Sequence, residues 1–192
     1  DSLIQLDLLK RVNEFKAEET TVTINSSMGL DGADNSIQMS LRLDNLTLAA
    51  TAGDAEAMFG LGIYYSDQKE PLKSQQWLEK SAGTGFVDAM EALGQKYAVG
   101  GFDGEPDYQK GGHWLKKAAE ENSFQAMVSL GEIVLAGNFP GNKPGQAVEW
   151  FRKAAEQGFA PAQTRLGGLL FEGSVVKQDI KGGMEWMHKA AA

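Results

Sequence analysis

A tryptophan motif that recurs at a constant interval constrains the fold of this chain more than any other feature of its sequence. Each of the four tryptophans opens a hexapeptide with lysine at its fourth position and alanine at its sixth. Successive tryptophans are separated by 37, 36 and 36 residues, and the motifs begin at Trp77, Trp114, Trp150 and Trp186. Such a period predicts a repeat architecture in which each unit packs mainly against its neighbours, with the tryptophans in the core of the stack.

A second motif, A-x-x-x-L-G, recurs in phase with the first. Its leucines are Leu61, Leu93, Leu130 and Leu166. The alanine, the leucine and the residue four positions later follow i, i+4, i+8 spacing, which places them on one face of a helix. Glycines near 100, 137 and 173 then predict the end of that helix. Gln68 replaces the glycine in the first unit, so we expect that turn to have a shape of its own.

The tryptophan motif belongs to a second helix in each unit. A small residue lies three positions before each tryptophan, at Ser74, Gly111, Ala147 and Gly183. Small residues allow two helix backbones to approach closely. Asp107 and Asp179 precede their helices at positions suited to an N-cap. Each unit is therefore predicted to be a pair of antiparallel helices.

Together these motifs resemble the Sel-one-like repeat, a relative of the tetratricopeptide repeat. The shared pattern is A-x-x-x-L-G-x-x-Y, a glycine-rich turn and D-x-x-K-x-x-x-W-x-x-K-A-A, and it covers residues 46–192, with Val134 and Leu170 where tyrosine is usual. Residues 46–50 look like the tail of a degenerate second helix. The resemblance implies a mainly α fold, a right-handed superhelical solenoid of four helix-turn-helix repeats. Its units are expected at about 54–85, 86–122, 123–158 and 159–192.

The first 45 residues follow a different pattern and are predicted to form a separate segment. Apolar residues between Leu3 and Phe15 recur at helical spacing. Every second residue from Ile37 to Leu43 is apolar, which is typical of a half-buried strand, and residues 21–24 form a shorter matching run. Turn-forming residues lie between these two runs. We therefore expect an N-terminal helix followed by a β-hairpin within residues 1–45.

The sequence contains no recognisable catalytic or metal-binding constellation. It has no cysteine, and its two histidines occupy different positions of the repeat. S-x-x-K occurs at 66–69 and 174–177, but the S-D-N and K-T-G motifs of β-lactamase chemistry are absent. The acidic turn that begins at Asp103 lacks the glycine and the final glutamate of an EF-hand loop. We predict no enzyme activity, no catalytic residue, no cofactor and no metal site.

The net charge of −8 disfavours nucleic acid as a partner, because phosphate binding needs a concentrated basic surface. No apolar run approaches the roughly 20 residues of a membrane-spanning helix, so we predict no membrane insertion. The chain begins at Asp1. Either a leader was cleaved or the terminus was trimmed, and the sequence does not distinguish the two. We favour a periplasmic or secreted location over a cytoplasmic one.

By analogy with tetratricopeptide units, the partner-binding residues are expected on the concave surface lined by the first helices. The variable positions two residues before and after each motif leucine point inward in such units. These positions hold Phe59, Ile63, Glu91, Gln95, Val128, Glu132 and Thr164, with Gly168 as the eighth. The alternative for Phe59 and Ile63 is contact with the N-terminal segment, whose apolar face also needs to be covered.

The favoured function is a non-catalytic protein–protein interaction module. The family resemblance implies a scaffold, a regulator or an inhibitor of the immunity type that binds a bacterial partner protein. One alternative is a hydrolase of the β-lactamase-like kind that has been linked to related repeats, and another is a fragment of a larger cell-envelope protein. Self-association is also expected to be possible, through the uncapped C-terminal repeat or through the N-terminal hairpin.

Overall fold

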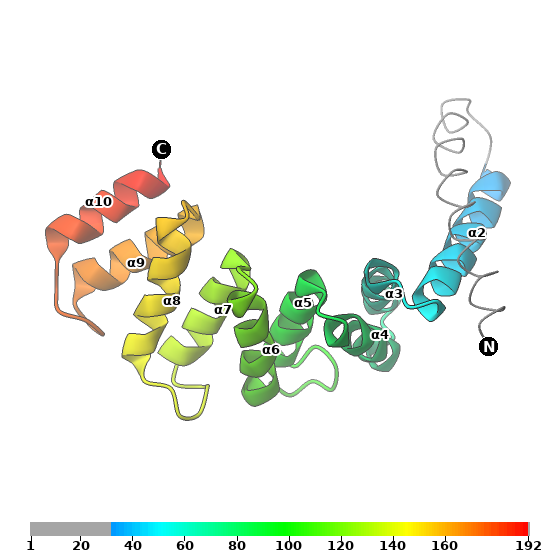
Figure 1. The fold of residues 1–192 in the computed structure, drawn as a ribbon, viewed down its shortest axis with the longest axis horizontal. Helices are drawn as coiled ribbons and strands as arrows, with labels where there is room; N and C mark the ends of the chain where they lie inside the picture. The colour runs from blue at the N-terminus through cyan, green and yellow to red at the C-terminus, as the bar shows by residue number, and fades with distance from the viewer. Residues whose placement is uncertain (1–31, 192) are drawn as a thin grey trace. The chain divides into compact units, whose positions relative to one another are not determined.

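The computed structural model describes residues 32–191, and every regular element within that range is a helix. The chain divides into two compact units, residues 1–86 (unit 1) and residues 87–192 (unit 2). Unit 1 contains α2 (Gly32–Thr51), α3 (Ala55–Asp67) and α4 (Pro71–Gly83). Unit 2 contains α5 (Val87–Ala98), α6 (Tyr108–Glu120), α7 (Phe124–Leu135), α8 (Pro144–Glu156), α9 (Ala160–Glu172) and α10 (Ile180–Ala190) (Figure 1). None of these helices is both long enough and apolar enough to span a bilayer.

Unit 1 is built around the apolar face of α3, which packs against both α2 and α4. Ala57 and Leu61 of the repeat motif are buried together with Ala50 of α2. Leu43 and Leu46 pack against the same cluster, and they share one face of α2 with Ala50 because the three residues follow i, i+3, i+7 spacing. Helix α2 thus takes the place that the second helix of a preceding repeat would occupy against α3.

The predicted strand at residues 37–43 is wrong, because these residues lie inside α2. The alternation covers only four apolar positions, too few to separate the strand period from the helix period. Leucine, methionine, glutamine and arginine, which dominate the stretch, are all strong helix formers. The rest of the predicted N-terminal helix and hairpin lies outside the described residues. Helix α2 also runs through the predicted domain boundary at residues 45 and 46, and that boundary stays a prediction.

Unit 2 consists of three helix pairs stacked in order, α5 with α6, α7 with α8 and α9 with α10. The second helix of one pair contacts the first helix of the next, α6 with α7 and α8 with α9. In addition α5 contacts α7 and α7 contacts α9, whereas α6, α8 and α10 do not contact one another to a comparable extent. The first helices are therefore more closely spaced, and the stack of unit 2 curves towards them. We call the open side of α5, α7 and α9 the inner face.

The glycine of the A-x-x-x-L-G motif permits the close approach of the two helices in a pair. A β-carbon placed on Gly94 would lie only 2.7 Å from Cγ of Leu115 and 3.0 Å from the carbonyl oxygen of Gly111. In the last pair, a β-carbon on Gly183 would lie 2.8 Å from the carbonyl oxygen of Gly167. The residue after each of the first three tryptophans fills the interface and is fully buried; these residues are Leu78, Leu115 and Phe151. The predicted role of the small residues is therefore confirmed.

The turns after the first helices also follow the sequence prediction in unit 2. Gly100, Gly137 and Gly173 adopt left-handed backbone conformations with φ of 69°, 72° and 69°. In unit 1 the left-handed residue is Lys69, with φ of 59°, and Gln68 keeps a φ of −74°. The first turn thus has its own shape, as predicted. Its left-handed residue comes one position later than in the other turns, because no glycine stands at the equivalent position.

Two adjacent glycines of α9 provide a direct test of this packing. Alanine at Gly167 would meet Cγ of Met187 at 2.8 Å and the carbonyl oxygen of Gly183 at 2.9 Å, whereas alanine at Gly168 would meet nothing within 4 Å. We expect Gly167→Ala to lower the free energy of unfolding by about 1–3 kcal/mol through overpacking. We expect Gly168→Ala to raise it by up to about 1 kcal/mol, because alanine is the better helix former. Urea unfolding followed by circular dichroism measures both; equal effects would contradict the packing account.

Candidate functional site

Six of the eight positions predicted to line the concave surface lie on the first helices of unit 2, and two of them link neighbouring repeats. Glu91 of α5 accepts a hydrogen bond from Oγ of Ser123 at 2.6 Å and another from Nε2 of Gln95 at 3.3 Å. Ser123 is itself the N-cap of α7, where its side chain accepts from the N–H of Ala126 at 3.1 Å. The Glu91 carboxylate therefore joins α5 to the start of the next first helix.

Glu132 makes the corresponding link between α7 and α9. Its two carboxylate oxygens accept from Nε and Nη2 of Arg165 at 2.6 and 2.7 Å, a bidentate geometry. The Glu132 side chain holds the pKa of Arg165 above its usual value, mainly through these hydrogen bonds. The Arg165 and Glu132 side chains are 45% and 43% exposed, so water screens the pair and its contribution to stability is small.

The other predicted residues differ in how accessible they are. In unit 2, Thr164 is exposed and donates its hydroxyl to the carbonyl oxygen of Ala160, while Val128 is half-buried. In unit 1, Ile63 is 36% exposed, and the half-buried Phe59 packs its ring against Phe86 with centroids 5.6 Å apart. The predicted alternative for Phe59 and Ile63, contact with the N-terminal segment, stays a prediction.

The four tryptophans are half-buried, and Trp77 packs against the buried cluster of unit 1 as predicted. The lysine three positions after each tryptophan lies over the ring, with Nζ between 4.1 and 4.6 Å from the centroid. A lysine at that distance is attracted to the ring face and covers it with its methylene stem. The W-x-x-K spacing of the motif therefore encodes a stacking pair at the surface of each second helix.

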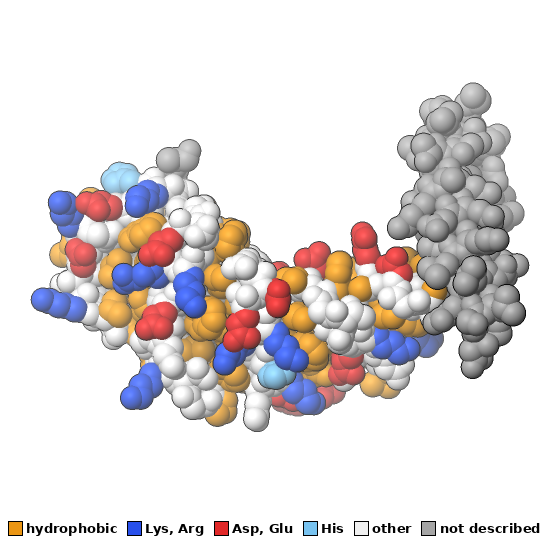
Figure 2. Space-filling model, in the orientation of Figure 1, with side chains coloured by type: hydrophobic (Ala, Val, Ile, Leu, Met, Phe, Trp, Pro, Cys, Tyr) orange, Lys and Arg blue, Asp and Glu red, His pale blue; other side chains and the backbone are white. Residues whose placement is uncertain are grey.

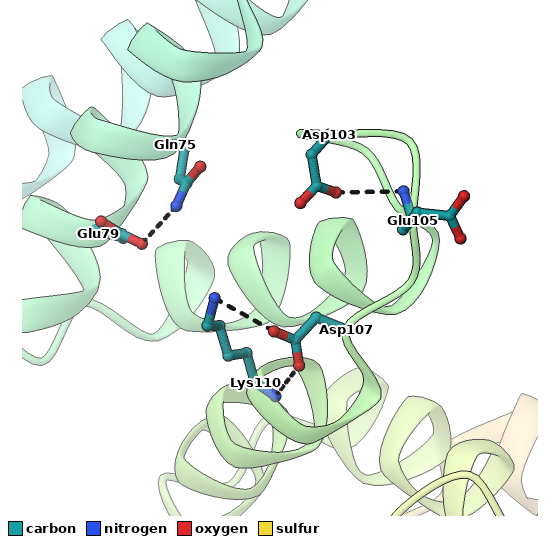
Figure 3. Close-up of polar contacts among 6 residues, drawn as sticks. All are labelled: Gln75, Glu79, Asp103, Glu105, Asp107 and Lys110. Carbon is teal, nitrogen blue, oxygen red and sulfur yellow. Dashed lines mark hydrogen bonds and ion pairs between the residues drawn. The ribbon is translucent and has the colours of Figure 1, made fainter.

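The acidic turn between α5 and α6 is used for capping. Asp107 accepts from the backbone N–H of Lys110 at 2.9 Å, and its other carboxylate oxygen lies 3.2 Å from the Lys110 ammonium (Figure 3). The backbone hydrogen bond from Lys110 is the main cause that holds the pKa of Asp107 below its usual value. Asp103 accepts from the N–H of Glu105 at 3.2 Å within the turn. Asp179 caps α10 in the same way as Asp107 caps α6, so both predicted N-caps are confirmed.

Among the described residues, no three histidine, aspartate or glutamate side chains lie close enough to hold a metal ion. Of the two S-x-x-K sites, Ser174 donates its hydroxyl to the Glu172 carboxylate at 3.4 Å. Figure 2 shows acidic and basic side chains interspersed over the visible face of unit 2, with apolar side chains between them.

Sequence reasoning identified Glu91 and Glu132 but missed their partners, Ser123 and Arg165. Each partner lies 32 or 33 residues further on, slightly less than one repeat, so a search for complementary polar residues at that separation would have found both. It also missed the groove beside Trp150, which is lined by Phe124 and other residues at helix ends.

The comparisons with known proteins agree with this architecture. A family model described as Sel1 repeat matches residues 55–83, 87–123, 125–159 and 160–192. No curated protein matches the chain. The crystal structure of c5321, a protective antigen present in uropathogenic Escherichia coli strains displaying an SLR fold, is 36% identical with a TM-score of 0.70, over 78% of this chain and 32% of that one. A Sel1 repeat protein from Oxalobacter formigenes is 25% identical with a TM-score of 0.69, over 79% and 61%.

The chain thus spans about a third of the first of these proteins and about three-fifths of the second. The predicted family resemblance and the helical solenoid are confirmed by the family match together with both structural neighbours.

The Glu132–Arg165 pair is expected to couple neighbouring repeats weakly but measurably. In a double-mutant cycle with Glu132→Gln and Arg165→Gln, we expect a coupling energy of about 0.5–1 kcal/mol, since the pair is bidentate but exposed. It should shrink at 1 M salt because salt screens exposed charges. Lys181 and Glu185, 3.9 Å apart within α10, form a more exposed control pair that should couple less. Urea unfolding measures both cycles, and zero coupling for Glu132 and Arg165 would contradict the inter-repeat role.

Proposed function

We propose that this chain, which belongs to the Sel1 repeat family, is a non-catalytic protein-interaction module that binds a partner through the inner face of unit 2. Sel1 repeats generally mediate protein–protein interactions. The observation that carries the proposal is the pair of links from Glu91 to Ser123 and from Glu132 to Arg165. These links hold neighbouring first helices in register, so the inner face keeps its shape before a partner binds. Such preorganisation lowers the ordering cost of association.

The partner that we propose is a bacterial protein, with this chain acting as its scaffold, regulator or inhibitor. Both solved structures reported above come from bacterial proteins, and one of them is a protective antigen. The inner face carries acidic residues in its middle, at Glu91 and Glu132, which favours a partner with basic side chains at the contact. No arrangement of the described residues supports the hydrolase alternative.

Affinity capture with surface variants tests this proposal. The variants are Thr164→Arg on the inner face and the charge swap Glu132→Arg with Arg165→Glu, which preserves the ion pair and reverses its polarity. Glu149→Arg, an exposed position on α8, is the matched control on a second helix. We expect the amount of captured partner protein to fall at least tenfold with both inner-face variants and to stay the same with Glu149→Arg. Capture that is equal for all variants would move the binding site away from the inner face.

Self-association is a second proposal, through α10. Met184 and Met187 are 49% and 38% exposed, whereas Val148 and Phe151 at the same positions of the preceding pair are 3% and 0% exposed. With Ile180, which is 49% exposed, these methionines form a stripe at i, i+4, i+7 that suits packing against an identical helix. The other predicted route used the N-terminal hairpin, and we do not pursue it because residues 37–43 are helical.

Light scattering coupled to size-exclusion chromatography tests the α10 contact. We expect the apparent mass of the unchanged chain to rise as its concentration increases from about 10 to about 200 µM, the range in which a weak helix–helix contact forms. We expect Met184→Lys to keep the mass of a monomer throughout. Leu72→Lys alters an apolar residue of unit 1 that is 70% exposed and serves as the control. A monomer at every concentration, or equal effects of the two variants, would exclude the contact.

A further inference from the structure

A groove with an apolar floor lies at the junction of α6, α7 and α8, on the ends of the helices. Its volume is about 590 Å³, within the range of ligand sites. Phe124 and Met127 from the first turns of α7, together with Trp150 of α8, supply its apolar lining. Glu120 from the end of α6 and Glu156 from the end of α8 also line it. None of the inner-face link residues lines the groove, although Ser123, the partner of Glu91, stands between the lining residues Asn122 and Phe124.

At the next junction along the chain, different residues stand at the equivalent positions. There Ala160 and Gln163 occupy the positions that Phe124 and Met127 hold one repeat earlier. The Gln163 side chain is only 6% exposed and donates from Nε2 to the carbonyl oxygen of Ala155 at 3.1 Å. A polar side chain therefore folds back onto the preceding second helix at this junction. At the groove, methionine stands at that position and makes no such hydrogen bond.

The charges around the groove favour a cation. Two acidic residues, Glu120 and Glu156, and one basic residue, Lys153, line the groove, and Lys153 is held over the Trp150 ring at 4.6 Å from its centroid. Helices α6 and α8 both end here, and the C-terminal end of a helix attracts positive charge. Lys116 approaches Glu120 only to 4.0 Å with both side chains more than half exposed, so it neutralises that carboxylate weakly.

We propose that this groove binds a peptide segment of a partner protein in which an arginine or lysine stands next to a large apolar side chain. The apolar residue lies on the half-buried Phe124, and the cation lies beside the Glu120 and Glu156 carboxylates. An aromatic wall beside paired carboxylates suits this combination, because a cationic side chain places its stem on apolar surface and its head in the acidic rim. The groove is a second contact surface and does not depend on the inner face.

Short peptides test the chemistry directly on the intact chain. The probes are acetylated, amidated tetrapeptides, Gly-Arg-Leu-Gly and its charge-reversed counterpart Gly-Glu-Leu-Gly. Two-dimensional NMR follows the four indole N–H signals during titration, and Trp150→Phe assigns the Trp150 signal. We expect the arginine peptide to shift the Trp150 signal with a dissociation constant on the order of 1 mM, as befits so short a ligand, and the glutamate peptide to bind at least fivefold more weakly.

Three variants sharpen the test. Glu120→Gln with Glu156→Gln is expected to weaken the arginine peptide about threefold to tenfold, as the loss of two exposed charge contacts implies. Glu149→Gln, on α8 but outside the groove lining, should leave its affinity unchanged. The inner-face swap of Glu132 and Arg165 should leave peptide binding unchanged even if it abolishes partner capture.

Several outcomes would overturn the proposal. Absence of any shift with the arginine peptide, or equal affinity for the two peptides, would remove the basis for a cation-selective groove. A shift at another tryptophan only would place the peptide elsewhere. A Trp150 signal that moves with protein concentration alone would assign the groove to a second copy of the chain.

Discussion

The structure depends on how closely the two helix backbones of each repeat approach one another. In the α5–α6 pair, Gly94 and Gly111 leave no room for a β-carbon on either helix, and in the α9–α10 pair Gly167 and Gly183 do the same. The close approach brings a large side chain of the second helix, such as Leu115, onto the motif glycine, where it is fully buried. Packing at this density leaves few ways to shift one helix along the other. The positions of all surface residues in a repeat follow from that fixed pair.

Outside this core, a contact between a tyrosine and a lysine occurs in some repeats, and the others lack both residues. Tyr65 and Tyr97 each lie under a lysine from the second helix of the same pair, Lys73 and Lys110, with Nζ 5.0 and 5.1 Å from the ring centroid. The last two repeats have Val134 and Leu170 at the tyrosine position, and Gln146 and Gly182 at the lysine position. The two halves of the contact are therefore both present or both absent. Each of these lysines also pairs with a carboxylate, Glu70 or Asp107, so the ring is one of two contacts that hold it.

How far the sequence predicted this structure depends on how many independent signals marked each feature. The repeats carried two motifs in phase, so the helix pairs, their glycine turns and the caps at Asp107 and Asp179 followed from the sequence alone. The strand at residues 37–43 rested on one short alternation, and packing of Leu43 and Leu46 against α3 decided in favour of a helix. The inner-face glutamates were found by their repeat position. Their partners, Ser123 and Arg165, were missed because a contact between repeats depends on the distance between helices, which the position of a residue within the motif does not give.

For function, the differences between junctions matter more than the motif that all repeats share. The motif residues pack within a helix pair, whereas the residues in the first turn of each first helix differ from one repeat to the next. At the junction of α8 and α9, Gln163 returns to the carbonyl oxygen of Ala155 and fills the space. One repeat earlier, Met127 and Phe124 leave an open groove between two acidic helix ends. The junctions of unit 2 thus differ in the first turn of each first helix, while the close helix contacts that maintain the fold stay the same.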